Sequence, residues 1–310
     1  MMPARFPDNR TFAFSIFDDT DGATVANVAP VYRLLAELGL RTTKSVWPLA
    51  EVPGAPLGGA TLQDADYLRF VRGLQADGFE IGFHNARNDD SPREVTAQGL
   101  AAFADLLGQP PRTHCNHHDN RENLYWGPAR LGSAALRLGY NLATRGRYRR
   151  LFSGHLEGSP HFWGDLCRER LRYLRNFVFD EINLDAINPT MPYHDPAKPY
   201  VPAWFSSSEG GTVESFCRLL REENQDRLAA QGGVCLVYTH FAKGFVQGGE
   251  VHPEFARLLR RLAGKLGWFP PVGPLLDHLQ GGPTAATIPP AELRRMENRW
   301  LRGKLRAGSS

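Results

Sequence analysis

The first half of the chain alternates short apolar runs with amphipathic segments of helical period. Four apolar runs are predicted to be strands: residues 11–17, 41–47, 79–83 and 112–116. Three segments between them have the spacing of helices that bury one face: residues 24–38, 63–76 and 91–107. Strands that alternate with helices in this way predict an α/β fold with a parallel sheet.

The second half of the chain has a looser pattern. Three further runs are predicted to be strands: residues 140–144, 177–183 and 234–239. A long stretch rich in Pro and aromatic residues, 188–211, separates the last two. A loop of that length inside a compact domain is usually functional or disordered, and its aromatic residues favour packing. We therefore predict a long ordered insertion near residues 184–211.

Acidic and histidine side chains follow four of the predicted strands. They are Asp18 and Asp19, His84, His117 and His118, and His240. Because the carboxyl ends of parallel strands gather at one edge of a sheet, we expect these side chains to share a site. Imidazole and carboxylate groups are suitable ligands for zinc or a similar divalent ion. If Asp19 binds the ion, Asp18 can stay ionised beside it and act as a general base.

Three of these strand ends carry a resemblance to a known family. The stretch IFDD, residues 16–19, resembles the TFDD-type first motif of the polysaccharide deacetylases, also called carbohydrate esterase family 4. EIGFH, residues 80–84, is similar to the family's EIGxH, and LVYTH, residues 236–240, resembles its last motif. The resemblance covers roughly residues 10–245. It implies a distorted (β/α)7-type barrel and the hydrolysis of an N-acetyl or related acyl group on an amino sugar.

The resemblance also implies roles for individual residues. Asp18 matches the general base, Asp19 and His84 match metal ligands, and His240 matches the general acid that protonates the leaving amine. The implied cofactor is a divalent metal, with zinc expected first and nickel, iron or cobalt as alternatives.

Two family positions differ in this sequence. The second metal histidine normally comes four residues after the first, where this chain has Asn88. We predict that His117 replaces it, with His118 next, His114 third, and the Asn88 carbonyl oxygen as a further alternative. The family's third motif carries an Arg that steadies the base, and this chain lacks it there. Two arginines could stand in for it: Arg112 and Arg121.

Five further residues are predicted to contact the substrate: Asn116, His118, Trp126, Arg145 and His194. Arg145 belongs to the basic segment TRGRYRR, residues 144–150. That segment suits an anionic sugar, or the diphosphate of a nucleotide- or lipid-linked sugar. A solvated basic loop has the same composition.

Composition and charge narrow the function classes. The 310 residues include 36 Lys and Arg against 33 Asp and Glu, a formal charge of +3 that does not favour nucleic acid as a partner. The four cysteines stand far apart and form neither a disulfide framework nor a cysteine zinc site. The sequence has no secretory leader and no apolar stretch long enough for a membrane span, so we expect a cytoplasmic protein.

We expect two parts in the chain, a barrel domain over residues 1–280 and a basic amphipathic segment over residues 281–310. Leu293, Met296 and Trp300 lie near one face of a predicted C-terminal helix, and arginines enrich the rest. Such a helix packs on its own barrel or lies at the inner membrane surface, and we favour the barrel.

The resemblance and the strand-end residues together predict a metal-dependent sugar N-deacylase. A narrower similarity points to bacterial enzymes of surface-polysaccharide and O-antigen biosynthesis. Two alternatives stay open. One is a carbohydrate-binding relative without activity, and the other is a metal-dependent hydrolase of a formyl or cyclic amide.

Overall fold

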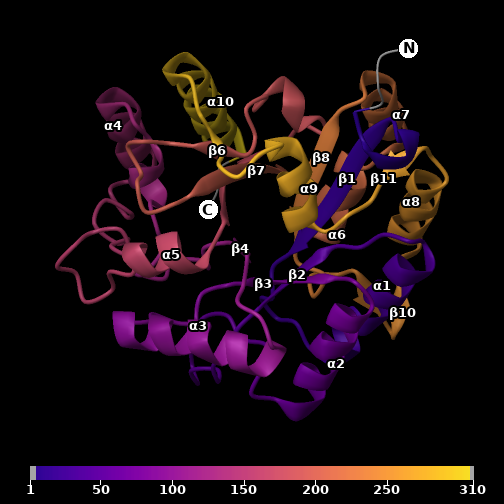
Figure 1. Ribbon diagram of the computed structural model, residues 1–310, viewed down its shortest axis with the longest axis horizontal. Helices are drawn as coiled ribbons and strands as arrows, with labels where there is room; N and C mark the ends of the chain where they lie inside the picture. The colour runs from indigo at the N-terminus through magenta and orange to yellow at the C-terminus, as the bar shows by residue number, and fades with distance from the viewer. Residues whose placement is uncertain (1–4, 308–310) are drawn as a thin grey trace.

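Seven parallel strands form a closed ring in the computed structural model, which describes residues 5–307 (Figure 1). Around the ring they are β1 (Phe12–Asp18), β2 (Thr43–Val46), β3 (Glu80–Phe83), β4 (Thr113–His114), β5 (Tyr173–Phe179), β7 (Ala203–Glu209) and β8 (Val234–Thr239). β8 pairs with both β7 and β1, and this pairing closes the barrel. The predicted α/β barrel of (β/α)7 type is confirmed.

Short strands extend this sheet outside the ring. β11 (Gly267–Trp268) pairs with β1, β6 (Tyr193–His194) pairs antiparallel with β7, and β12 (Ala286–Thr287) pairs with β6. A separate hairpin joins β9 (Val246–Gln247) to β10 (Glu250–Val251).

Helices surround the barrel (Figure 1). They are α1 (Val25–Glu37), α2 (Ala65–Ala76), α3 (Arg93–Leu107), α4 (Ala134–Ala143), α5 (Gly164–Arg170), α6 (Val213–Leu219), α7 (Glu222–Gln231), α8 (Pro253–Ala263), α9 (Val272–Gln280) and α10 (Pro290–Ala307). Three short 3₁₀ segments are η1 (Pro7–Asn9), η2 (Gly127–Arg130) and η3 (Leu184–Ala186). None of the helices within residues 5–307 is long and apolar enough to cross a membrane.

The first βα unit shows how the sequence produces this arrangement. Every residue of β1 is buried because the barrel covers both of its faces. α1 begins after Thr24, whose hydroxyl accepts a hydrogen bond from the Asn27 backbone N–H. After the helix, Gly39 takes a left-handed conformation with φ of 72°, which turns the chain toward β2.

The parallel register brings the carboxyl ends of the strands to one edge. Asp18, the last residue of β1, lies opposite Lys44 of β2 and Thr239 of β8. Phe83, the last residue of β3, lies opposite His114 of β4. The residues that follow these strands therefore meet at the same end of the barrel.

Three predicted elements differ from the structure. The strand expected over residues 177–183 is β5, which begins four residues earlier and ends at Phe179. Residues 140–144 were expected to be a strand, but they form the last turn of α4 and its C-cap, and Tyr140 stacks on Trp300 of α10 with ring centroids 5.7 Å apart. That contact is long-range, so local sequence does not reveal it. The expected insertion near residues 184–211 is ordered, with Tyr193 and Val201 buried, but its last part is the barrel strand β7.

The basic C-terminal segment forms α10, which packs against α4 and β5 (Figure 1). Met296 and Trp300 are buried there, and the Trp300 ring centroid lies 5.6 Å from that of Phe177. The apolar face of the helix therefore contacts the barrel, as we favoured. Contact with a membrane surface stays a prediction.

Candidate functional site

The carboxyl ends of the strands open into one cavity of about 2040 Å³. Asp19, Asp21, His84 and His240 line its inner end. Helix α10 and the segment after β4 line its outer part. Residues that are distant in the sequence therefore share one solvent-accessible space.

Asp18 is fully buried and does not belong to the cavity lining. Its carboxylate accepts hydrogen bonds from the Tyr32 hydroxyl at 2.9 Å and the Phe241 backbone N–H at 2.8 Å. The Lys44 ammonium, also fully buried, lies 3.1 Å from it. Burial raises the pKa of Asp18 although Lys44 acts against this change. Through these contacts the Asp18 carboxylate links β1 to β2, to α1 and to the segment after β8.

Asp19 faces the cavity and pairs with a different cation. The Arg175 guanidinium donates to both of its carboxylate oxygens, at 2.9 and 2.6 Å. The Cys115 thiol donates to the same carboxylate at 3.2 Å. Burial alone would raise the pKa of Asp19, but Arg175 and nearby histidines lower it to about 2. Asp19 is therefore ionised and held in one orientation.

Asp21, three residues beyond the end of β1, is the centre of a histidine cluster. One carboxylate oxygen lies 3.0 Å from His84 Nε2 and 3.4 Å from His117 Nε2. The other oxygen lies 3.1 Å from His240 Nε2. The pKa of Asp21 is well below its usual value because these contacts outweigh its burial. The carboxylate is therefore ionised beside three imidazoles.

Asp21, His84 and His117 could hold a metal ion, since one ligand atom from each lies within 4.8 Å of the others. Among the described residues, neither ring nitrogen of His117 has a hydrogen-bond partner, although both are buried. Burial lowers the pKa of His117 to about 3, so the ring is neutral, which is the form that binds metals. Trp47 packs its ring 5.0 Å from that of His117 and shields it from water. These features fit a metal ligand.

A second group, Asp19, His84 and Cys115, has comparable spacing. It fits a metal less well, because Arg175 already occupies both oxygens of Asp19. Burial also raises the pKa of the Cys115 thiol far above its usual range, and a thiol must ionise before it binds a metal. We therefore take the Asp21 group as the candidate metal centre.

His240, directly after β8, lies on the other side of Asp21. Its Nδ1 is 3.0 Å from the Gly211 carbonyl oxygen, and its Nε2 faces Asp21. Both nitrogens thus face acceptors, the arrangement of a protonated imidazolium. Burial alone would lower the pKa of His240, but the hydrogen bond and charge of Asp21 raise it.

The structure separates the other predicted residues. Asn116, His118 and Trp126 line the cavity. Arg145, after α4, and His194, on β6, are not among the described residues that line it. His194 instead places Nδ1 3.3 Å from the Pro202 carbonyl oxygen.

Four other predicted site residues, the alternative metal ligands Asn88 and His114 and the arginines Arg112 and Arg121, contact other groups. Asn88 accepts a hydrogen bond from the Val52 backbone N–H at 2.8 Å, and His114 places Nδ1 3.0 Å from the Phe83 carbonyl oxygen. The two arginines that were predicted to steady the general base form ion pairs elsewhere: Arg112 with Asp277, and Arg121 with Asp90.

Sequence reasoning missed Asp21 and Arg175. Asp21 lies in Thr20-Asp21-Gly22, which has the composition of an ordinary turn. Arg175 lies within the apolar strand YLRNFVF of β5. A charged residue inside a buried strand requires a buried partner, so Arg175 carried a signal, but nothing local identified Asp19 as that partner.

Solved structures share this fold. A probable polysaccharide deacetylase from Pseudomonas aeruginosa PAO1 matches with a TM-score of 0.52 at 15% identity, over 90% of this chain and 94% of that one. The Puue allantoinase matches with a TM-score of 0.51 at 14% identity, over 91% and 94% of the two chains. No family model matches this sequence, and a comparison with curated proteins gives no significant match.

Proposed function

We propose that this protein is a metal-dependent hydrolase that removes an N-acetyl or related acyl group from an amino sugar. The observation that carries the proposal is the buried group of Asp21, His84 and His117, which opens on a cavity that Asp19 and His240 also line. In this assignment the metal carboxylate is Asp21, and Asp19 takes the role that the sequence motif assigned to Asp18.

The proposed metal ligands are Asp21, His84 and His117. A divalent ion bound there, zinc or another of the expected metals, supplies a Lewis acid that polarises the acyl carbonyl and lowers the pKa of water. His117 Nε2 and His84 Nε2 already face the same oxygen of Asp21, so little rearrangement of side chains is needed.

Asp19 is the proposed general base. Its carboxylate is ionised, lines the cavity, and is fixed by two hydrogen bonds from Arg175. A fixed, ionised carboxylate can accept the proton of the attacking water. Asp18 cannot do this without rearrangement, because Tyr32, Lys44 and the Phe241 N–H surround it.

His240 is the proposed general acid. The Gly211 carbonyl oxygen orients the ring through Nδ1, and Nε2 points toward Asp21 at the cavity. In this role its Nε2 gives a proton to the departing amine.

The size of the cavity favours a sugar over a small cyclic amide. Its volume of about 2040 Å³ exceeds the range of about 300–1000 Å³ that is usual for small-ligand sites. A cyclic amide, the alternative left open by the sequence, would fill only part of it. Surface-polysaccharide or O-antigen biosynthesis remains the proposed setting on the sequence resemblance alone.

Elemental analysis combined with acyl release tests the proposal. We expect about one metal ion per wild-type chain and release of acetate from acetamido sugars. Asp21→Ala and His117→Ala should lose the metal, and acyl release should fall at least about 10³-fold, because Lewis-acid stabilisation is worth several kcal/mol.

His118→Ala is the matched control, since it removes the adjacent histidine, and it should keep the metal. Loss of metal in His118→Ala but not in His117→Ala would move the ligand to His118. A wild-type protein that takes up no metal would exclude the hydrolase and favour a sugar-binding barrel.

A further inference from the structure

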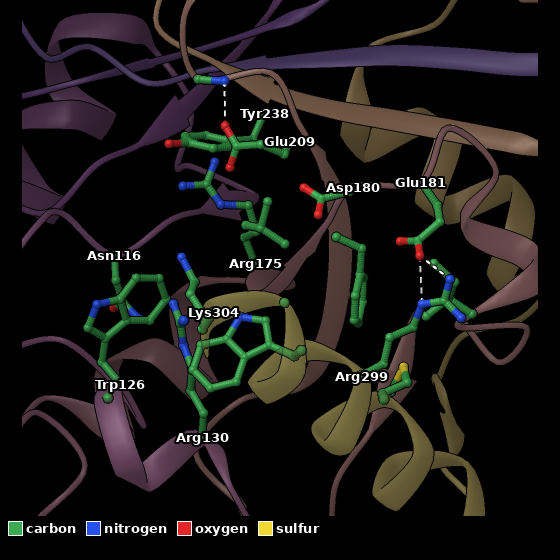
Figure 2. A pocket seen from close by; sticks show the side chains of 18 of the residues that line it. Asn116, Trp126, Arg130, Arg175, Asp180, Glu181, Glu209, Tyr238, Arg299 and Lys304 are labelled. Atoms are coloured by element: carbon green, nitrogen blue, oxygen red, sulfur yellow. Dashed lines mark hydrogen bonds and ion pairs between the residues drawn. The ribbon is translucent and has the colours of Figure 1, made fainter. Parts of the chain in front are cut away.

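Arg130 is a buried cation on the wall of the cavity. It ends the 3₁₀ segment η2 and is 6% exposed. Its guanidinium carbon lies 3.2 Å from the ring centroid of Trp126 and 5.1 Å from that of Trp300 on α10. Figure 2 shows Trp126 and Arg130 on the same part of the wall, with Arg175 facing the same space.

The other buried Lys and Arg side chains among the described residues are all paired with a carboxylate. Lys44 pairs with Asp18, Arg175 with Asp19, and Lys198 with Asp195. Within residues 5–305, no carboxylate forms an ion pair with Arg130, and its buried Nε has no hydrogen-bond partner. Arg130 is therefore the exception among the buried cations of the described residues.

An unpaired buried charge is costly to the fold. Burial lowers the pKa of Arg130 to about 9, which reflects that cost. The two indole faces offset part of it through cation–π attraction, but within residues 5–305 the buried Nε–H has no acceptor. We therefore expect the Arg130 guanidinium to bind an anionic ligand that is not part of this chain.

The surroundings of Arg130 specify the charge of that partner. Among the residues that the structure describes, nine Lys and Arg side chains line the cavity against six Asp and Glu, so its potential attracts anions. Arg299, another of these cations, is already paired with Glu181, with Nε 2.7 Å from the carboxylate (Figure 2). The planar guanidinium of Arg130 suits two parallel hydrogen bonds to a carboxylate or a phosphate.

We propose that Arg130 binds an anionic group of the sugar substrate, a carboxylate or a phosphate, in the same cavity as the Asp21, His84 and His117 group. This inference rests on the proposed function and narrows it. The substrate class becomes an acylamino sugar that carries an acidic group, as a uronic acid or a sugar phosphate does. Arg145, which the sequence suggested for such a role, does not line the cavity.

Binding measurements by calorimetry, which do not depend on turnover, test this inference. The probes are N-acetylglucosamine, its 1-phosphate and its uronic acid. We expect the wild-type protein to bind at least one anionic sugar about 10- to 100-fold more tightly than the neutral sugar, the range of a charge-assisted hydrogen bond. Whichever anionic sugar gains more identifies the group as phosphate or carboxylate.

Three variants assign the effect. Arg130→Met should remove the advantage of the anionic sugar and leave affinity for the neutral sugar unchanged. It should also unfold at the same temperature as the wild type or a higher one without ligand, since it removes an unpaired charge. Arg130→Lys keeps the charge without the planar guanidinium, so the affinity advantage of the anionic sugar should decrease several-fold. This variant preserves the test if Arg130→Met does not fold. Arg299→Gln is the matched control and should keep the advantage.

Equal affinity for anionic and neutral sugars in the wild type, or an unchanged advantage in Arg130→Met, would overturn the inference. Acyl release is followed in parallel and separates the two proposals. Anion binding through Arg130 without acyl release from any sugar would refute the hydrolase and keep this site. If the protein releases the acyl group from a neutral sugar and substitution of Arg130 changes no affinity, the hydrolase stands and the Arg130 site is refuted.

Discussion

Asp18 and Asp19 are neighbours in the sequence, both are buried and both pair with a cation, yet their surroundings differ. Asp18 points into the packed interior, toward Tyr32 and Lys44. Asp19 points into the cavity, where Arg175 holds it. Burial raises the pKa of Asp18, whereas the charge of Arg175 lowers the pKa of Asp19. Because successive residues of an extended chain face opposite sides, one motif supplies both a structural carboxylate and the proposed general base.

Strand β4 and the segment after it differ in the same way in where they place their histidines. His114 lies in the interior, with its ring 5.3 Å from that of Trp163, and hydrogen-bonds to the Phe83 carbonyl. His117, three residues later, faces Asp21. Both rings are buried and have lowered pKa values. Burial and residue type therefore do not distinguish the proposed ligand His117 from the core residue His114, and the direction of the side chain does.

The largest expected effect is on the cavity side, from Asp19→Asn. Turnover should fall about 10²- to 10⁴-fold, because the amide cannot accept the proton of the attacking water. Metal content should stay near one per chain, since Asp19 is not a ligand in our assignment. Acyl release per metal-containing, folded molecule is the measurement. If the variant loses its metal, Asp19 is a ligand, as the sequence motif suggested.

The interior carboxylate should show the reverse pattern. Asp18→Asn leaves Lys44 buried without a counter-charge, so the free energy of unfolding should fall by about 3–5 kcal/mol. Acyl release per folded molecule should remain. Urea unfolding and turnover at matched folded fraction measure the two effects.

The double variant Asp18→Asn with Lys44→Met removes both charges and should recover most of the lost stability. This outcome would identify the unpaired lysine as the cause. An Asp18→Asn protein with wild-type stability and no turnover would instead restore Asp18 as the general base.

The sequence predicted the barrel well where the signal is local. The alternation in the first half placed β1 to β4 and α1 to α3, because each strand and helix there has its own period. Residues 140–144 were misassigned because a contact between Tyr140 and the distant Trp300 decides their structure.

The same limit applies to the site. Residues that end strands, such as His84 and His240, were placed at the cavity from the pattern alone. The partners of Asp19 and Asp18 were not, because Arg175 and Lys44 come from other strands, and only the register of the barrel brings them together. Asp21 was hidden because it lies in a turn, where an aspartate is common for local reasons.

The smallest expected effect concerns His114 and the pH dependence of stability. Burial lowers its pKa to about 3 in the folded protein, whereas an unfolded histidine titrates near 6.5. As the pH falls below about 6.5, the unfolded chain takes up a proton that the folded chain does not, so stability decreases toward pH 3. Between pH 7.5 and pH 5 this residue should account for about 2 kcal/mol of lost stability.

His114→Asn tests this contribution, since its side-chain amide can still donate to the Phe83 carbonyl but cannot titrate. Urea unfolding at pH 7.5 and pH 5 should show that the free energy of unfolding decreases by about 2 kcal/mol less in the variant than in the wild type. His117 titrates in both proteins, so its contribution cancels in the comparison. Parallel pH dependence in the two proteins would mean that His114 takes up its proton at the same pH in the folded and the unfolded chain, and the contrast between an interior histidine and the proposed metal ligand would no longer hold.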